Sequence, residues 1–393
     1  MPQEQNRRGS GLQLAVIGGS ASGLFAASLL ARAGRSVEVL ERDEQLDPAP
    51  RTLIVTHRMR SLLGEVGERS VVNEIRKFEL FTDGRSAQIP LNKPDLIVER
   101  ARLIRGLAEE AERHGARLTY GRKFVSLEST GNGLRVAVER LHDGRTEELH
   151  ADIVVGADGA LSRVAESSGW PRLPTVPLVQ AIVRVPKDAS PDTVRVWFVP
   201  DDTPYFYWLI PESPQRAALG LIGEDGQETR RCLERFLEKR GLTPIEFQGA
   251  RIPVYRHWTP VERRVGAGRV YLVGDAAGQV KVSTVGGIVT GFRGALGVSE
   301  AILNGGPSRE LRALRRELDL HLLIRRTIHQ FKQADYSRLV DLMNAPMHRS
   351  LGQYTRDEAA RVLWHLALSQ PRLLLLGLRG LLSGGSILPK SRG

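Results

Sequence analysis

The stretch 14-LAVIGGSASGLFAASLLARAGRSVEVLER-42 decides the fold. Because it is apolar and follows two arginines, it can be read as an export signal or a membrane anchor. Glycines interrupt it, however, so it contains no run of about 18 apolar residues that could span a bilayer. Residues 14–17 have the pattern of a buried strand, 24–33 of a helix rich in Ala and Leu, and 37–40 of a second buried strand. The stretch therefore predicts a βαβ unit.

The glycines of this unit follow the pattern of a dinucleotide-binding turn. Gly18 permits a tight turn after the strand, and Gly23 lets the helix pack close to the sheet. The helix N-terminus would face a pyrophosphate, and Glu41 would accept hydrogen bonds from ribose hydroxyls. Ser20 stands where the pattern has its middle glycine. A plain βαβ unit with a glycine turn therefore stays the alternative.

Composition restricts the class of protein. The chain has 393 residues, 41% of them hydrophobic, which is enough for a large core in two or three domains. It has one cysteine and nine histidines without metal-ligand spacing, so we expect neither a disulfide framework nor a metal site. The net charge is +11, but arginines are scattered and often lie beside glutamates. We therefore expect no nucleic-acid partner, whereas anionic substrates or membrane surfaces remain possible partners.

The rest of the chain predicts a mixed α/β protein. Residues 78–90 and 134–150 have the pattern of hairpins, and 95–114 the pattern of an amphipathic helix. Residues 178–222 are rich in short strand patterns, which predicts an antiparallel sheet. Beyond about residue 306 the pattern is helical.

Two further motifs combine a buried strand with a glycine-rich turn. In 156-GADGALSRV-164 an acid, Asp158, stands in the turn before a helix. In 274-GDAAG-278 another acid, Asp275, follows a strand and precedes only small residues, which suits a sugar-phosphate chain at a helix N-terminus. Each motif alone is also compatible with a glycine loop that binds nothing.

Together and in this order, the three motifs resemble those of the FAD-dependent oxidoreductases of the p-hydroxybenzoate hydroxylase fold. The resemblance covers roughly residues 12–305. Within that fold the chain is similar to the geranylgeranyl reductases, which have counterparts of 281-KVSTVGGI-288 and of 206-FYWLIP-211. The reductases carry a proline where Val282 stands and a glycine where Val285 stands. Some also have a cysteine that 49–57 lacks.

The resemblance implies FAD as cofactor and a set of site residues. Phe206 and Trp208 would line the substrate cavity, since alternate residues of a strand share a face; ordinary sheet packing is the alternative. The implied cofactor-binding residues are Gly18, Gly19, Ser20, Gly23, Glu41, Arg42, Arg100, Asp158, Gly274, Asp275, Gly278, Gly286, Gly287 and Ile288.

Other residues of this region are further candidates. Arg51 could touch the cofactor or an acidic substrate, and His57 could act as an acid or base. Tyr205 and Tyr207 carry hydroxyls that could donate a proton. Lys281 occupies the reductase-type position.

The resemblance also implies an arrangement of domains. The fold class is α/β, with a discontinuous Rossmann-like FAD-binding domain, an antiparallel β-sheet substrate domain and a helical C-terminal segment. The expected boundaries are 11–75, 95–175 and 262–305 for the FAD-binding domain, 76–94 and 176–261 for the substrate domain, and 306–393 for the helical region. We expect a cytoplasmic protein whose apolar tail, 371–393, docks on the domain, contributes to dimerisation or touches a membrane surface.

The expected activity is reduction of a carbon–carbon double bond in an apolar, isoprenoid-like substrate by reduced flavin. The alternative is a monooxygenase that hydroxylates with NAD(P)H and O₂. A halogenase and a flavin-fold protein without turnover are further alternatives. Since no second dinucleotide fingerprint is present, we expect NAD(P)H to dock transiently, or a protein to donate the electrons.

Overall fold

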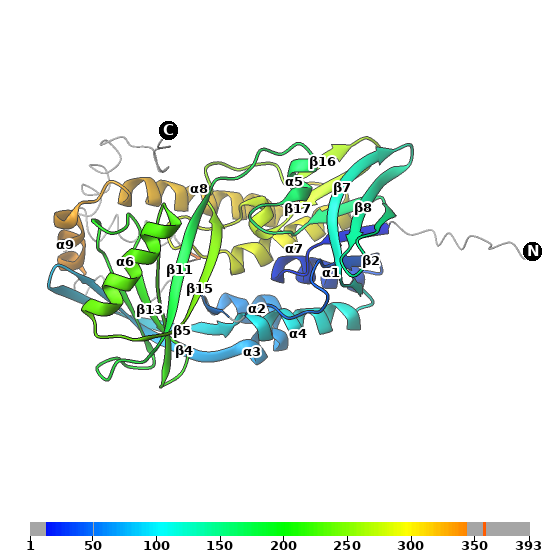
Figure 1. Ribbon diagram of the computed structural model, residues 1–393. Coiled ribbons are helices and arrows are strands. Elements are labelled where there is room, and N and C mark those ends of the chain that lie inside the picture. Colours follow the sequence, from blue (N-terminus) through cyan, green and yellow to red (C-terminus); the bar gives the residue numbers. More distant parts are fainter. Residues whose placement is uncertain (1–12, 50, 344–356, 359–393) are drawn as a thin grey trace, which may run out of the picture.

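The computed structural model describes residues 13–49, 51–343 and 357–358. Figure 1 shows two regions side by side, one built on a parallel sheet and one on a large, mostly antiparallel sheet. No helix of the described ranges is both long and apolar enough to cross a membrane. The tail at 371–393, for which we expected docking, dimerisation or a membrane contact, lies outside these ranges.

The first sheet has six strands, and all but the edge strand β16 pair in parallel. In spatial order they are β16 (Glu262–Val265), β17 (Gly268–Leu272), β10 (Ile153–Gly156), β1 (Gln13–Ile17), β2 (Ser36–Leu40) and β6 (Arg117–Thr119). Their core residues are almost fully buried because helices cover one face and the small sheet β7–β9 the other. The three glycine motifs lie at the carboxyl ends of β1, β10 and β17, which are neighbours, so the sheet brings the motifs together.

Three helices form the layer on the first sheet. They are α1 (Ala21–Arg32), α4 (Arg100–Arg113) and α7 (Ile288–Asn304), and α1 packs against the other two. The opposite face carries β7 (Arg122–Thr130), β8 (Gly133–Arg140) and β9 (Thr146–Ala151). Shorter helices complete this region: α2 (Arg58–Leu63), α3 (Glu65–Ser70), α5 (Arg163–Ser167) and the 3₁₀ turn η1 (Gly274–Ala277).

The second sheet has eight strands and is antiparallel except for the pair β12–β4. Its order is β15 (Pro244–Pro253), β11 (Thr175–Arg184), β14 (Arg216–Ile222), β13 (Tyr207–Pro211), β12 (Thr193–Trp197), β4 (Val71–Thr82), β5 (Arg85–Glu99) and β3 (Thr52–Val55). Helix α6 (Gly226–Lys239) covers one face. The other face packs against α8 (Arg309–Ile328) and α9 (Gln333–Leu342).

Most local expectations agree with these elements, but the helix at 95–114 is wrong at its start. The strand β5 continues to Glu99, because residues 96–99 pair with β3. The Glu99 side chain then caps α4, accepting from the amides of Ala101 and Arg102 at 2.9 and 2.8 Å. The hairpin turn at Asp83 and Gly84 is confirmed: both have positive φ, as a two-residue turn between twisted strands requires. The domain boundaries stay a prediction.

Candidate active site

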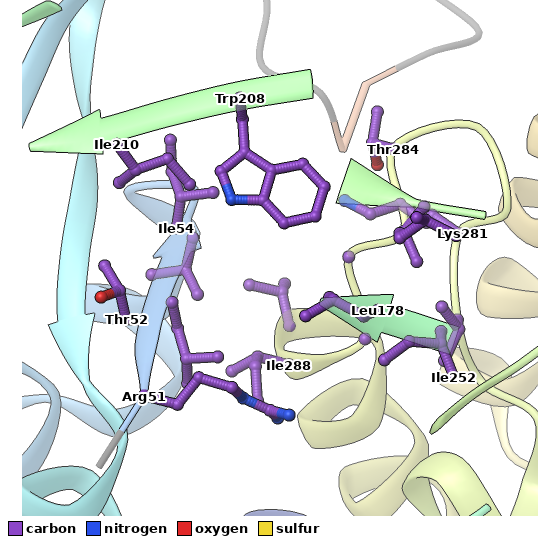
Figure 2. A pocket seen from close by; sticks show the side chains of 18 of the residues that line it. Arg51, Thr52, Ile54, Leu178, Trp208, Ile210, Ile252, Lys281, Thr284 and Ile288 are labelled. Atoms are coloured by element: carbon purple, nitrogen blue, oxygen red, sulfur yellow. The ribbon is translucent and has the colours of Figure 1, made fainter. Parts of the chain in front are cut away.

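A cavity of about 500 Å³ lies between the two sheets. Part of its wall comes from the glycine motifs and helix starts of the parallel-sheet region, including Ser20, Arg100, Asp275 and 286–288, and Arg51, just before β3, lines it as well. The remaining wall is one face of the eight-stranded sheet together with α8, and it is largely apolar (Figure 2). A single cavity therefore joins a polar region of helix starts to an apolar region.

The first glycine turn requires its glycines. Gly18 has φ +103°, and a Cβ there would lie 2.7 Å from the Ala157 carbonyl oxygen. A Cβ on Gly23 would lie 2.5 Å from the Gly18 carbonyl oxygen. Both neighbours are backbone atoms, so neither clash can be relieved by a side-chain movement. The loops after β1 and β10 are thus held in contact, which the two motifs did not reveal separately.

Ser20 is the N-cap of α1. Its hydroxyl accepts a hydrogen bond from the Gly23 amide at 3.2 Å, and its backbone is extended. Serine is among the preferred residues at this position because its oxygen satisfies a free helix N–H. The departure from the glycine pattern is therefore compatible with the turn, and Ser20 also lines the cavity.

Glu41 and Arg42 follow β2 at the same edge of the sheet. The Glu41 carboxylate accepts from the amides of Gly19 at 2.5 Å and Asp43 at 3.0 Å. It is thereby held beside the glycine turn. The Arg42 side chain is 74% exposed and pairs with Asp43. Neither residue borders the cavity itself, so their role in binding a cofactor stays a prediction.

The carboxylate of Asp158 forms hydrogen bonds to the start of the helix that follows it, α5. It accepts from the Ser162 hydroxyl at 2.5 Å and from the Val164 amide at 3.1 Å, and so organises the start of α5. Its neighbours Ala157 and Gly159 border the cavity, whereas Asp158 does not. Of the two predicted acids, the one that reaches the cavity is Asp275. Gly274, with φ +63°, and Gly278, with φ +65°, flank Asp275 and form the turn around it.

Asp275, Arg51 and Arg100 form a charged group at the polar wall. Burial raises the pKa of Asp275, while Arg51 and Arg100 oppose that rise. Burial lowers the pKa of Arg51 and of Arg100, and the attraction of Asp275 opposes both changes. Arg100 is the first residue of α4, so its side chain leaves the helix start at the polar wall of the cavity. Together the carboxylate and the two guanidinium groups offer an acceptor for hydroxyls and donors for phosphate oxygens.

The N-terminus of α7 opens onto the same cavity. Gly286, Gly287 and Ile288 border it, and no side chain caps this helix. A Cβ on Gly287 would lie 3.3 Å from the Asp275 carboxylate. The helix start therefore presents backbone N–H groups and the positive end of its dipole to whatever the cavity holds.

Val285, in the loop before α7, has a strained backbone. Its φ is +54°, in the left-handed region that β-branched residues avoid. The loop is closed on itself, because Lys281 and Gly286 form a β-bridge and the Val285 amide donates to the Lys281 carbonyl at 2.7 Å. The strain thus lies in a segment that borders the cavity.

We expect this strain to reverse the usual ranking of alanine and glycine. Val285→Gly should be more stable than Val285→Ala by about 1 kcal/mol, since only glycine adopts this φ freely. Denaturant unfolding of both variants measures the difference. At Val125, which lies on strand β7, the alanine variant should be the more stable one. The same ranking at both positions would contradict the strain.

Alternate residues at and just before β13 share a face in the apolar wall. Phe206, which precedes the strand, and Trp208 and Ile210, which lie in it, border the cavity, and the ring centroids of Phe206 and Trp208 lie 6.2 Å apart, edge to face. Figure 2 shows the Trp208 side chain extending from its strand into the cavity, near Ile54. The indole N–H of Trp208 is buried without a hydrogen-bond partner among the described residues.

Tyr205 and Tyr207, considered together as proton donors, are separated by the sheet. Tyr205 borders the cavity. Tyr207 is fully buried on the opposite face, stacked on Phe236, and its hydroxyl donates to Asp202 at 2.8 Å. The prediction that Tyr207 could donate a proton to a ligand in this cavity is therefore wrong. Successive residues of a strand point to opposite faces, so Tyr207 points away from the face that carries Phe206 and Trp208. His57, a further candidate, does not border the cavity either.

Lys281 has a partner that the sequence did not suggest. The residue is 4% exposed, and its amine forms an ion pair with Asp357. Asp357 also accepts from the Thr56 hydroxyl. In Figure 2 the Lys281 amine extends from its loop into the cavity on the side of Trp208. No local pattern marks Thr56 or Asp357, which are separated by 301 positions in the chain.

These residues fit FAD. The cradle at Gly18 and Gly23 leaves room only for glycine, and two helix starts and two arginines supply donors for a pyrophosphate. Asp275 supplies an acceptor for sugar hydroxyls. The uncapped start of α7 supplies amides for an electron-rich ring. The part of the cavity beyond that ring is apolar.

Comparison with known proteins agrees with this assignment. A family model described as "FAD binding domain" matches residues 12–302. The geranylgeranyl diphosphate reductase of Synechocystis sp. is 30% identical over 74% of this chain and 75% of its own length. A geranylgeranyl bacteriochlorophyll reductase-like protein from Thermoplasma acidophilum has TM-score 0.76 at 18% identity, covering 94% of this chain and 99% of its own. The flavin-dependent monooxygenase PieE has TM-score 0.60 at 18% identity, covering 95% and 71%. The two structural likenesses bear on the fold alone, and they confirm the expected fold class.

Proposed function

Since the chain belongs to the FAD-binding-domain family and is an FAD-dependent oxidoreductase, we propose that it reduces a carbon–carbon double bond in an apolar, isoprenoid-like substrate. The observation that carries this proposal is the continuity of the cavity. The start of α7, where the flavin ring would lie, opens directly onto the apolar wall of Phe206, Trp208 and Ile210. The Synechocystis relative, whose name states reduction of geranylgeranyl diphosphate, supports the same class of substrate.

Reduced FAD, when bound, supplies a hydride. The amides of 286–288 would stabilise negative charge at the ring edge, and Asp275, Arg51 and Arg100 would hold the sugar-phosphate part. The apolar wall would exclude water and align an uncharged chain. Burial raises the pKa of Tyr205, so its hydroxyl keeps its proton at neutral pH and can donate it to the substrate. We further propose NAD(P)H, docking transiently, or a partner protein as the electron donor.

Product mass in a single turnover tests the proposal. Protein reduced photochemically without air is mixed with geranylgeranyl diphosphate, and the product is analysed by mass spectrometry. We expect the substrate to gain two hydrogen atoms per reduced flavin. If the substrate stays unchanged without air but gains one oxygen atom in air, the activity is that of a monooxygenase and the proposed reductase activity is wrong.

A pair of tryptophan variants provides the control. Trp208→Ala should raise KM about tenfold or more, since a buried aromatic contact of about 1.5–3 kcal/mol is lost. Trp197 lies on the neighbouring strand but packs on the opposite face of the sheet. Trp197→Ala should lower stability and leave KM unchanged. Equal KM values in both variants would show that Trp208 does not contact the substrate.

A further inference from the structure

Arg325, on α8, differs from the other basic residues that border the cavity. Lys281 is paired with Asp357, and Arg51 and Arg100 face Asp275. Arg325 is only 3% exposed, yet among the described residues it forms no ion pair. A buried cation without an acid beside it is unusual in a folded protein.

The partners of Arg325 are neutral. One terminal nitrogen donates to the Pro204 carbonyl at 2.9 Å and the other to Nδ1 of His329 at 3.0 Å. Burial, together with Arg325 itself, lowers the pKa of His329 to about 4, so this ring is uncharged at neutral pH and accepts the bond. The guanidinium carbon lies 3.7 Å from the centre of the Tyr205 ring. Glu224 attracts it weakly from the surface.

The guanidinium retains capacity for a ligand. It has five N–H donors in a planar fork, and its described hydrogen bonds account for two of them. Burial lowers the pKa of Arg325, and no acid of the described residues forms an ion pair with it. A phosphate or carboxylate group matches the geometry of such a fork and would supply the missing negative charge.

The position of Arg325 indicates how a bound ligand would be oriented in the cavity. It lies near the C-terminal end of α8, which Figure 1 shows beside α9 and away from α1 and the parallel sheet. The surrounding cavity wall is apolar and includes Phe198, Tyr205 and Ile328. A ligand that reaches from Arg325 to the start of α7 would therefore be charged at one end only.

We propose that Arg325 binds the anionic end group, a phosphate or a carboxylate, of the apolar-chain substrate. This inference rests on the proposed function and adds an orientation to it. The anionic end lies at the α8 side of the cavity, and the chain extends towards residues 286–288. The double bonds presented for reduction are thus those distant from the charged end.

Ligand binding, measured without turnover, tests the site. Quenching of tryptophan fluorescence in the FAD-loaded protein is titrated with geranylgeranyl diphosphate, geranylgeranoic acid and geranylgeraniol. We expect the two anions to bind about tenfold to hundredfold more tightly than the alcohol, as for hydrogen bonds to a charged group. Arg325→Met should remove this preference by weakening the anions alone. Inorganic diphosphate, which lacks the chain, should compete only weakly.

Two further variants keep the result interpretable. Arg326, its exposed neighbour on the same helix, is the matched control, and Arg326→Met should keep the full preference. Arg325→Lys retains a charge and should retain part of the preference if Arg325→Met fails to fold. An anion preference that survives in a folded Arg325→Met or Arg325→Lys protein at the wild-type value would overturn the proposal. Tight, Arg325-dependent binding without reduction would instead reject the proposed function and keep the site.

Discussion

Replacing Asp275 with alanine is expected to lower the affinity for FAD about tenfold to hundredfold, the loss that follows removal of a charged hydrogen-bond partner. The carboxylate borders the cavity beside Gly287, and Arg51 and Arg100 both attract it. Without it, sugar hydroxyls lose their acceptor, and the two arginines lose the charge that both of them face. The variant should purify with little or no bound flavin.

The measurement is a titration of flavin-free protein with FAD, followed by flavin fluorescence. Asp275→Asn, which keeps one oxygen acceptor and the shape of the side chain, should bind with intermediate affinity. Asp201, an exposed carboxylate in the loop after β12, provides the control, and Asp201→Ala should bind FAD like the unchanged protein. Stoichiometric FAD of unaltered affinity in Asp275→Ala would place the cofactor elsewhere.

Replacing Lys281 with methionine is expected to destabilise the protein by about 3–5 kcal/mol, because it removes one partner of a buried ion pair, the amine that pairs with the Asp357 carboxylate. Both side chains are nearly inaccessible, with 4% and 5% exposure of the residues. The Thr56 hydroxyl also donates to the Asp357 carboxylate. Unfolding in denaturant, monitored by circular dichroism, measures the loss.

A double variant separates the loss of charge compensation from the loss of side-chain packing. Lys281→Met combined with Asp357→Asn removes both charges and should recover most of the lost stability. The exposed pair Lys123–Glu139, at 2.9 Å, is the control: Lys123→Met should cost at most about 1 kcal/mol. If Lys281→Met were no more harmful than Lys123→Met, the buried pair would not stabilise the fold.

Sequence reasoning was most reliable where a few contiguous residues impose a backbone geometry. Each glycine motif follows a buried strand, and the hairpin at Asp83 and Gly84 needs two residues that tolerate positive φ. Such requirements are local, so they are visible in the residue types themselves. The period of two along β13 likewise placed Phe206 and Trp208 on one face, and the same rule could have excluded Tyr207.

Local patterns were less informative where a residue serves two roles. Ser20 departs from the glycine motif, and only its hydrogen bond to the Gly23 amide identifies it as a helix cap. Asp158 belongs to a recognisable motif, yet its carboxylate binds α5 rather than facing the cavity. Residues 96–99 continue a strand that a helical pattern had included, because pairing with β3 outweighs local preference.

The βαβ unit and the three glycine turns can be predicted from neighbouring residues, because each depends on a local backbone requirement; the α/β fold class and FAD as cofactor followed from the family that these motifs resemble. Which charges are compensated became visible only in the three-dimensional arrangement. Asp357 meets Lys281 from 76 positions away, and Arg325 finds the Pro204 carbonyl 121 positions away but no described acid. Charge compensation depends on which distant side chains share a buried space, and no spacing along the chain encodes that.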